Sequence, residues 1–115
     1  MYINGLTEKT TKALRQRQKA MLRRLPPLKG ILRGSLVERY KRCGKAGCKC
    51  ARGPGHGPKY YLTVSFPKRP PEMKYVPEAF QEKVKQYLAN YRKAKEILEE
   101  LSSINRELLR RRERL

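Results

Sequence analysis

Three cysteines and one histidine are the residues of this sequence whose types and spacing suit metal chemistry. Cys43, Cys48, Cys50 and His56 form the pattern C-x4-C-x-C-x5-H, and the chain holds no other Cys or His. Three thiolates and one imidazole are a common tetrahedral zinc set. We therefore expect these residues to bind a structural Zn²⁺; an iron–sulfur or redox role, or no metal at all, are the alternatives.

The same segment argues against catalysis. A catalytic zinc keeps one position open for water and works with a general base. Here four ligands would fill the coordination sphere, and the nearest carboxylates in the sequence are Glu38 and Glu72. All ten acidic residues are Glu, so the two-metal sites built on Asp are excluded. We expect a protein that is not an enzyme.

Short strands are predicted on both sides of this segment. Residues 35–42 and 60–66 alternate in polarity with a period of two, and residues 72–76 form a weaker third strand. Residues 43–58 are rich in Gly and are expected to be an irregular loop, and residues 67–71 a basic turn. Two or three antiparallel strands around a zinc-binding loop are the expected unit.

Helices are predicted on either side of that unit. In the first, over residues 7–25, Thr7 is the expected N-cap, and Pro26 ends the helix. The second begins at Pro77, after which neither Gly nor Pro occurs. The fold class is α+β. It divides into a basic N-terminal helix or arm (1–29), a zinc-binding β unit (30–76) and a long C-terminal helix (77–115).

The C-terminal helix has a heptad pattern. Position a is held by Val84, Tyr91, Leu98, Asn105 and Arg112, and position d by Tyr87, Ala94, Leu101, Leu108 and Leu115. Ile97 and Ile104 at position g widen the apolar stripe. An intermolecular coiled coil and an αα-hairpin with the N-terminal helix both fit this pattern. For a homodimer, the expected contacts are Tyr87, Tyr91, Leu98, Leu101, Asn105 and Leu108.

The charge calls for a polyanionic partner. The 115 residues include 29 Lys and Arg against 10 Glu, a net charge of +19. Nineteen of the basic residues and only three of the acidic ones precede Pro77. Basic side chains neutralise phosphates and release counterions. The expected nucleic-acid contacts are Arg33, Arg39, Lys41, Arg42, Lys45, Lys49, Arg52, Lys59, Tyr61, Lys68, Arg69 and Lys74.

Tyrosines are interleaved with these cations, at Tyr40, Tyr60, Tyr61 and Tyr75. Their rings either stack on unpaired bases or form the core of the sheet. Few Asn or Gln side chains lie in the region of these cations to read base edges, so we expect binding dominated by phosphates. The partner is DNA or RNA; the sheet would enter a major groove, or the loop would grip single strands or structured RNA.

No segment has the length and apolarity of a membrane span, and the N-terminus lacks the apolar core of a signal peptide. We expect a cytoplasmic, nucleoid-associated protein. In a reducing compartment, clustered cysteines favour metal binding over disulfides.

Several motifs resemble those of a known protein family. They are Arg33-Gly-Ser-Leu-Val-Glu-Arg-Tyr-Lys-Arg-Cys-Gly-Lys-Ala-Gly-Cys-Lys-Cys50, then Gly55-His-Gly-Pro-Lys-Tyr-Tyr-Leu62, Lys74-Tyr-Val-Pro77, Asn90-Tyr91 and Ile104-Asn-Arg-Glu-Leu-Leu109. Over residues 31–110 the chain is similar to an uncharacterised family of small basic prokaryotic proteins, a domain of unknown function often encoded near mobile-element genes. The resemblance implies a mobile-element context and no particular activity. The order of elements is also similar to that of the arm-type DNA-binding domains of phage integrases, as an analogy of fold alone.

Two functional hypotheses follow. The first is a zinc-stabilised nucleic-acid-binding accessory or regulatory protein of a mobile element or phage. The second is a protein adaptor that docks a transposase or a ribonucleoprotein through its C-terminal helix.

Overall fold

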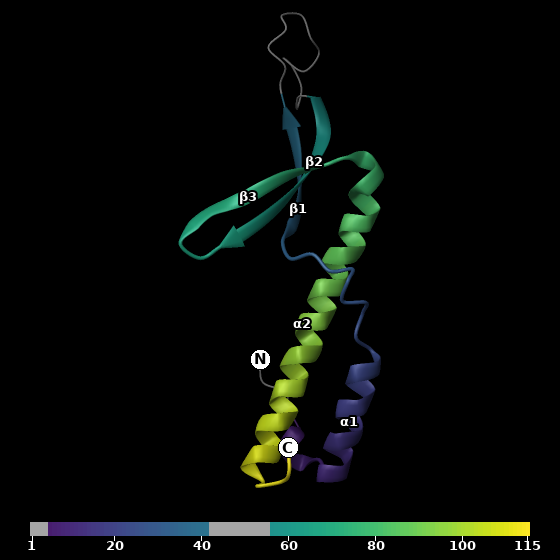
Figure 1. The fold of residues 1–115 in the computed structure, drawn as a ribbon, viewed down its shortest axis with the longest axis vertical. Coiled ribbons are helices and arrows are strands. Elements are labelled where there is room, and N and C mark those ends of the chain that lie inside the picture. The colour runs from purple at the N-terminus through teal and green to yellow at the C-terminus, as the bar shows by residue number, and fades with distance from the viewer. Residues whose placement is uncertain (1–4, 42–55) are drawn as a thin grey trace, which may run out of the picture. The chain divides into compact units, whose positions relative to one another are not determined.

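The residues that the structure describes fold into two α-helices and a three-stranded sheet (Figure 1). The structure is a computed structural model that describes residues 5–41 and 56–115. Two compact units are present, a helical unit (Met1–Gly30 with Ala89–Leu115) and a sheet unit (Ile31–Leu88). The long helix α2 contributes its first two turns to the sheet unit and the rest to the helical unit. The predicted α+β class is confirmed, with an N-terminal helix, a small antiparallel sheet and a long C-terminal helix.

Helix α1 spans Thr11–Arg23 and begins later than the sequence predicts. Thr10 is its N-cap, because the Thr10 hydroxyl oxygen accepts a hydrogen bond from the backbone N–H of Ala13 at 3.0 Å. The prediction of Thr7 as the cap is wrong: the preceding turn, Leu6–Glu8, is a separate 3-10 helix. Leu14 and Met21 face inward from α1, as expected from their helical spacing.

Helix α2 spans Gln81–Arg110, after a 3-10 turn over Glu78–Phe80 that Pro77 caps. The expected continuation to Leu115 is wrong. Arg112 has φ 61°, and the N–H groups of Arg112 and Glu113 donate to the carbonyls of Leu109 and Leu108. This left-handed residue with its two bonds is the Schellman end of a helix, held here by an arginine where glycine is the usual residue.

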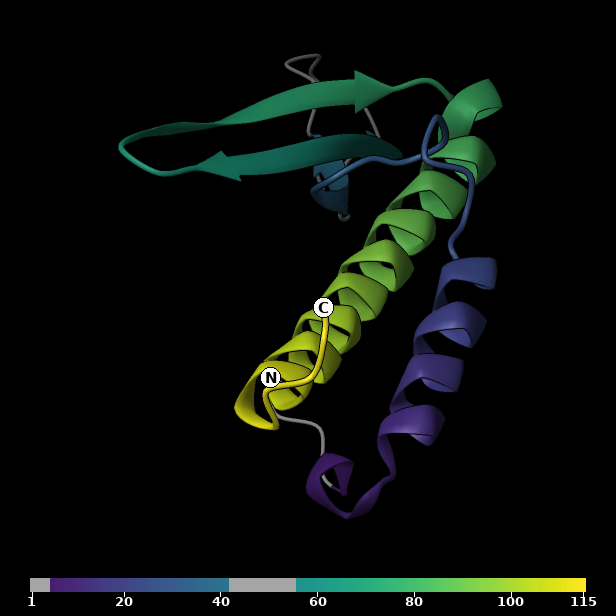
Figure 2. The same ribbon diagram turned by 60° about the horizontal axis from the view of Figure 1, so that its bottom comes forward.

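In the helical unit, α1 lies antiparallel beside the C-terminal part of α2 (Figures 1 and 2). Their shared core contains Leu6, Leu14, Ile104 and Leu108. The αα-hairpin alternative is therefore what the chain adopts. The buried stripe of α2 is centred on Ile97 and Ile104, at heptad position g, whereas Leu98 at position a is 62% exposed. The stripe is rotated from the predicted seam because α1, and not a second copy, covers this side.

Polar contacts fix the register of the hairpin. A guanidinium N–H of Arg17 donates to Glu100 Oε1 at 2.8 Å, and Gln18 Nε2 donates to Asn105 Oδ1 at 2.6 Å. At the other end, Arg111 donates to the backbone carbonyls of Leu6 and Lys9. These bonds tie the residues before α1, and the middle of α1, to the C-terminal part of α2 and to Arg111.

The sheet contains β1 (Ser35–Lys41), β2 (His56–Phe66) and β3 (Arg69–Val76), in the order β1-β2-β3 with antiparallel pairing. The expected strands are present, but β2 and β3 each begin earlier than predicted. The sequence predicts a loop up to residue 58, yet β2 begins at His56, which pairs with Lys41. Residues 69–71 were expected to be a turn, yet β3 begins at Arg69 because the hairpin loop has only two residues.

Proline positions explain both extensions. Pro58 lies where the β1–β2 register shifts between Arg39 and Lys41, and a bulge leaves room for a residue without an N–H. Pro70 and Pro71 lie on β3, an edge strand, where one side of the backbone needs no partner, and at the point where the β2–β3 register shifts between Val64 and Phe66. The pattern of breakers alone therefore predicted shorter strands than the pairing allows.

Gly34 joins the helical segment to β1 with φ 139°. A Cβ at this position would lie 2.6 Å from the carbonyl oxygen of Thr63. The sheet thus needs glycine here, both for the backbone angle and for the close approach of β2. In the part of the chain that the structure describes, no helix is both long and apolar enough to cross a bilayer.

Candidate functional site

One face of the sheet brings cations and aromatic rings together. Val37 pairs with Tyr61, and Tyr61 with Tyr75, so these three side chains form a row on one face. In the adjacent row Arg39 pairs directly with Lys59. We call the face formed by Arg39, Lys59, Val37, Tyr61 and Tyr75 the tyrosine face.

The cation pair on this face is unusual for a sheet. Like charges directly opposite each other repel and destabilise the pairing. Arg39 and Lys59 are both exposed and make no ion pair with any residue in the described ranges. An anion placed between the two side chains would remove this repulsion.

The rings beside the cations are arranged edge to face. The centroids of Tyr61 and Tyr75 are 5.8 Å apart with an interplanar angle of 65°, and the Lys59 ammonium lies 5.9 Å from the Tyr75 centroid. Tyr75 is 51% exposed. The pair therefore presents a supported ring to solvent beside two positive charges. Tyr75 lies outside the set of contacts predicted from the sequence. Because successive side chains of a strand point to opposite faces, Tyr75 lies on this face and its neighbour Lys74 on the other.

The opposite face has another character. Leu36 pairs with Leu62, and Leu62 with Lys74, so Lys74 is separated from Arg39 and Lys59 by the thickness of the sheet. On the same side the Tyr40 hydroxyl donates to Glu38 Oε1 at 2.8 Å. This hydrogen bond to a carboxylate, together with its charge, raises the pKa of Tyr40.

A second cationic cluster lies at the tip of the β2–β3 hairpin. The Arg69 and Arg33 guanidinium carbons lie 3.8 Å and 5.1 Å from the ring centroid of Phe66. Arg33 also donates to the carbonyl of Ser65 at 2.8 Å, and Arg69 lies 3.6 Å from a Glu72 oxygen. Lys68 lies in the loop and has φ 67°. This left-handed backbone angle is energetically unfavourable for any residue that carries a Cβ atom. The tip thus combines Arg33, Lys68 and Arg69, three of the predicted contacts.

The predicted metal ligands fall at the edge of what the structure describes. Cys43, Cys48 and Cys50 lie outside the described residues, as do the predicted contacts Arg42, Lys45, Lys49 and Arg52. Among the described residues there is no group of three potential ligands. The backbone pair of Lys41 with His56 closes the segment, with Cys43 two positions beyond Lys41 in the sequence. The pairing shown is that of Lys41 with His56 alone, and Cys43 itself lies outside the described residues.

The residues predicted for dimerisation have mixed environments. Leu108 is fully buried within the chain, and Asn105 is bonded to Gln18. Tyr87, Tyr91 and Leu101 are half-buried, whereas Leu98 is exposed. Of this set, Leu98 is the residue that the chain leaves most available.

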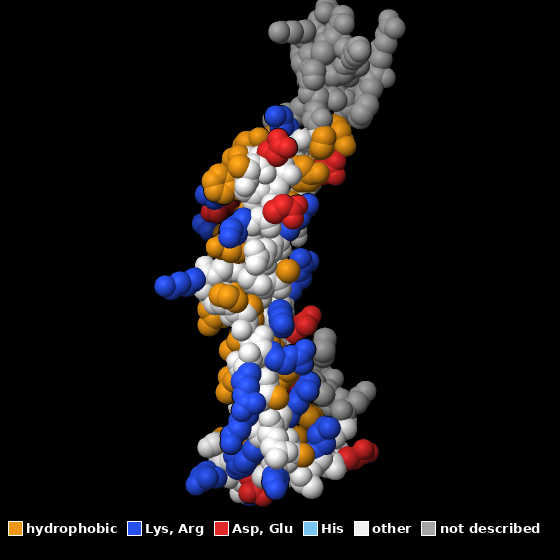
Figure 3. Space-filling model, turned by 90° about the vertical axis from the view of Figure 1, so that its right-hand side faces the viewer, with side chains coloured by type: hydrophobic (Ala, Val, Ile, Leu, Met, Phe, Trp, Pro, Cys, Tyr) orange, Lys and Arg blue, Asp and Glu red, His pale blue; other side chains and the backbone are white. Residues whose placement is uncertain are grey.

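Positive charge is also dense on the helical unit. The nucleic-acid contacts predicted from the sequence all lie within residues 33–74 and include none of its residues. This unit contains sixteen Lys and Arg against six Glu. In Figure 3, Lys and Arg side chains line the lower part of the molecule, where α1 lies. Among the glutamates of this unit, Glu107 accepts hydrogen bonds from Arg110 and Arg111 through its carboxylate. These bonds lower the pKa of Glu107 to about 2.

Comparison with known proteins gives one match. The family model described as a domain of unknown function (DUF6788) matches residues 11–86, which include α1, the whole sheet and the first turns of α2. No curated protein and no solved structure matches the chain. The match covers more than half of the sequence and agrees with the expected membership of an uncharacterised family. This protein belongs to the DUF6788 family.

Proposed function

We propose that this protein is a zinc-stabilised, non-enzymatic nucleic-acid-binding accessory protein. Its ligand is a single-stranded segment of DNA or RNA, bound across the tyrosine face. Phosphates neutralise Arg39 and Lys59, and an unpaired base stacks on Tyr75. The resemblance to a family found near mobile-element genes supports a regulatory role for such an element.

The observation that carries this proposal is the cross-strand pairing of Arg39 with Lys59 beside an exposed ring. A bound phosphate converts a repulsive pair into two favourable contacts. The 51% exposed ring of Tyr75 is held by Tyr61, so stacking a base on it costs little side-chain entropy. Paired bases in a duplex offer no free face to such a ring, and this favours unpaired strands.

The hairpin tip is proposed as a second contact with the same ligand. Lys68 retains a left-handed backbone angle that glycine would adopt without strain. Strain retained at an exposed cation is a pointer to function. Arg69 stacked on Phe66 presents a further guanidinium beside Lys68.

Zinc is proposed as the element that holds the segment between β1 and β2. The donors are Cys43, Cys48, Cys50 and His56, and the proposal is supported by the backbone pair of His56 with Lys41, which precedes Cys43 by two residues in the sequence. Bound Zn²⁺ supplies folding free energy, which suits a chain with few buried apolar residues.

The test is fluorescence anisotropy with a labelled single-stranded oligonucleotide and a duplex of the same length, at several salt concentrations. We expect tighter binding to the single strand, with an affinity that falls by a log–log slope of about −0.7 per phosphate contacted. An affinity that does not change with salt would overturn the proposal.

A matched pair of variants tests the role of the tyrosine face. Tyr75→Leu removes a stacking ring and should lower affinity by about 1–3 kcal/mol. Tyr40→Leu removes a ring of similar exposure, 47% against 51%, from the opposite face and should leave affinity unchanged. Equal losses in the two variants would contradict binding on the tyrosine face.

Self-association through the helical hairpin is a second proposal, favoured by the exposure of two leucines. Leu98 is 62% and Leu22 is 55% exposed. Leu22 follows Gln18 by one helical turn and Leu98 precedes Asn105 by two, so the Gln18–Asn105 bond places both on the same edge of the antiparallel hairpin. We propose that this edge meets a second copy of the chain.

Light scattering with size exclusion tests this second proposal. The intact chain should be a dimer, and Leu98→Gln a monomer. Leu28→Gln, which changes an exposed leucine outside both helices, is the control. A monomeric intact chain would contradict self-association and favour the alternative of an adaptor that docks a transposase or a ribonucleoprotein.

A further inference from the structure

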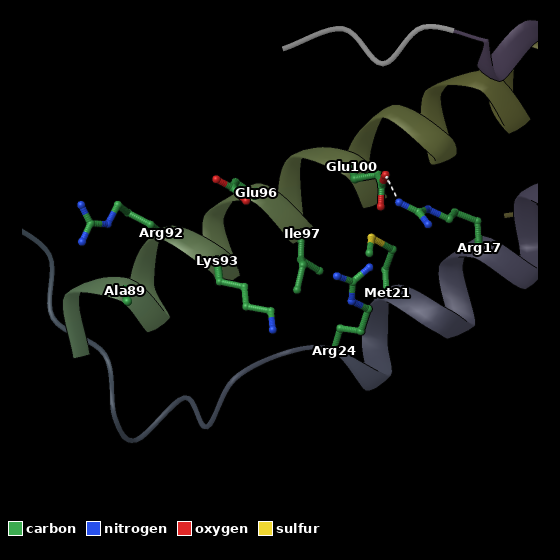
Figure 4. A pocket seen from close by; sticks show the side chains of 9 residues that line it. All are labelled: Arg17, Met21, Arg24, Ala89, Arg92, Lys93, Glu96, Ile97 and Glu100. Atoms are coloured by element: carbon green, nitrogen blue, oxygen red, sulfur yellow. Dashed lines mark hydrogen bonds and ion pairs between the residues drawn. The ribbon is translucent and has the colours of Figure 1, made fainter. Parts of the chain in front are cut away.

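A groove lies between α1 and α2 within the helical unit (Figure 4). Its volume is about 900 Å³, within the range of roughly 300–1,000 Å³ that is typical of small-molecule sites. Its lining combines an apolar floor with charged walls. The charged residues are Arg17, Arg24, Arg92, Lys93, Glu96 and Glu100.

The floor is formed by Met21 of α1 and Ile97 of α2. Their side chains face each other across the groove in Figure 4, and they are 5% and 4% exposed. Both side chains are apolar, and the methionine sulfur is polarisable. Such a floor suits an aromatic or apolar moiety.

The walls are more positive than the residue types alone suggest. Arg17 is neutralised by Glu100, at 2.8 Å. Arg24, at the C-cap of α1, and Lys93 of α2 project into the groove, and in Figure 4 Glu96 points away from both. Within the described ranges neither of these two cations makes an ion pair. Two unpaired cations facing each other across one groove favour an anion between them.

We propose that this groove binds a nucleotide unit, with its phosphate between Arg24 and Lys93 and its base over Met21 and Ile97. Arg92, at the outer edge of the groove, adds attraction for the charged ligand. The proposal uses no residue of the tyrosine face, so it does not depend on nucleic-acid binding there. The nucleotide is either free in solution or one unit of a strand, and the two sources share this chemistry.

Isothermal titration of the full chain with ADP tests the site. Arg24→Gln with Lys93→Gln should weaken ADP binding by about tenfold or more, because each substitution removes a charge-assisted bond. Lys19→Gln with Lys95→Gln is the matched control, since it removes one cation from each helix outside the groove lining. Glu96→Gln should tighten ADP binding. Arg17 neutralises Glu100, so Glu96 is the other carboxylate of the groove lining, and the substitution removes its negative charge.

Competition separates the two sources of the nucleotide. Displacement of ADP by an oligonucleotide, even from a chain carrying Arg39→Gln and Lys59→Gln, would support the site and assign it to a strand. Retention of ADP would support the site and assign it to a free nucleotide. The proposal is overturned if ADP does not bind, or if the groove variant and its control lose affinity equally. Failure of the tyrosine-face variants to alter oligonucleotide binding would instead count against the proposed function alone.

Discussion

Arg39 and Lys59 lie directly opposite each other on β1 and β2, so two positive side chains occupy neighbouring sites on an exposed sheet face. This arrangement lowers the stability of the fold when no ligand is bound. The pair therefore has opposite effects on two quantities that can be measured. It lowers the stability of the fold, and it is proposed to raise the affinity for nucleic acid.

Lys59→Glu should make the protein more stable and a weaker nucleic-acid binder. A glutamate opposite Arg39 replaces repulsion with a cross-strand ion pair worth about 0.2–1 kcal/mol. The same change places a negative charge where a phosphate is proposed to lie. Chemical denaturation and fluorescence anisotropy measure the two effects. Lys74→Glu is the control, since it makes the same change of charge on the opposite face. An equal loss of affinity in both variants would show that net charge, and not this pair, governs binding.

Lys68→Gly should also stabilise the fold while weakening binding. Pro67 and Lys68 form the two-residue loop between β2 and β3, and Lys68 has φ 67°. Glycine adopts this backbone angle without steric cost. We expect a gain of about 1 kcal/mol in the free energy of unfolding. Lys68→Arg keeps the charge and should retain oligonucleotide affinity. A Lys68→Gly variant that binds as tightly as the parent would show that the tip does not contact the ligand.

Metal removal should destabilise the sheet unit. Protein purified without chelators should contain about one Zn²⁺ per chain by elemental analysis, and a chelator should lower its melting temperature. Cys48→Ser should abolish metal binding. Ala46→Ser, in the same segment but at a residue that is not a donor, should retain it. Bound iron, or a chain that melts at the same temperature with and without chelator, would contradict a structural zinc.

Acid should weaken the helical unit through Glu107. Hydrogen bonds from Arg110 and Arg111 lower the pKa of Glu107 from 4.5 to about 2. Because the folded pKa is below the unfolded one, this contribution is complete above pH 4.5 and is lost as the pH falls toward 2. Denaturation followed by circular dichroism at several pH values should show this loss. Glu107→Gln should be less stable at neutral pH and should lose less stability on acidification. Parallel pH profiles for the two proteins would contradict this assignment.

Much of the fold follows from local patterns in the sequence. The alternation around Val64, the absence of breakers after Pro77 and the Pro26-Pro27 stop each predict an element that the structure contains. The ends of the elements were less predictable. Thr7 and Thr10 both have the side chain of an N-cap, and only the packing of Leu6 into the core of the hairpin favours Thr10.

The candidate site could be predicted in part. Composition and charge placed Arg39, Lys59 and Tyr61 among the predicted contacts, but they could not divide the cations between two faces. The strand register places Lys74 and Arg39 on opposite faces of the sheet, and it places Tyr75 beside Tyr61 on the same face. A shift of one residue in pairing would have reversed both results, because successive side chains point to opposite sides of a sheet.

The sequence alone determined the net charge of +19, the set of four potential metal ligands and the α+β order of elements, because these depend on residue type and local spacing. The tertiary structure decided which side of α2 is buried, which cations face each other, and that Arg24 and Lys93 meet across a groove. These features join residues far apart in the chain. No local pattern specifies them, because they depend on how α1 packs against α2 and how the strands align.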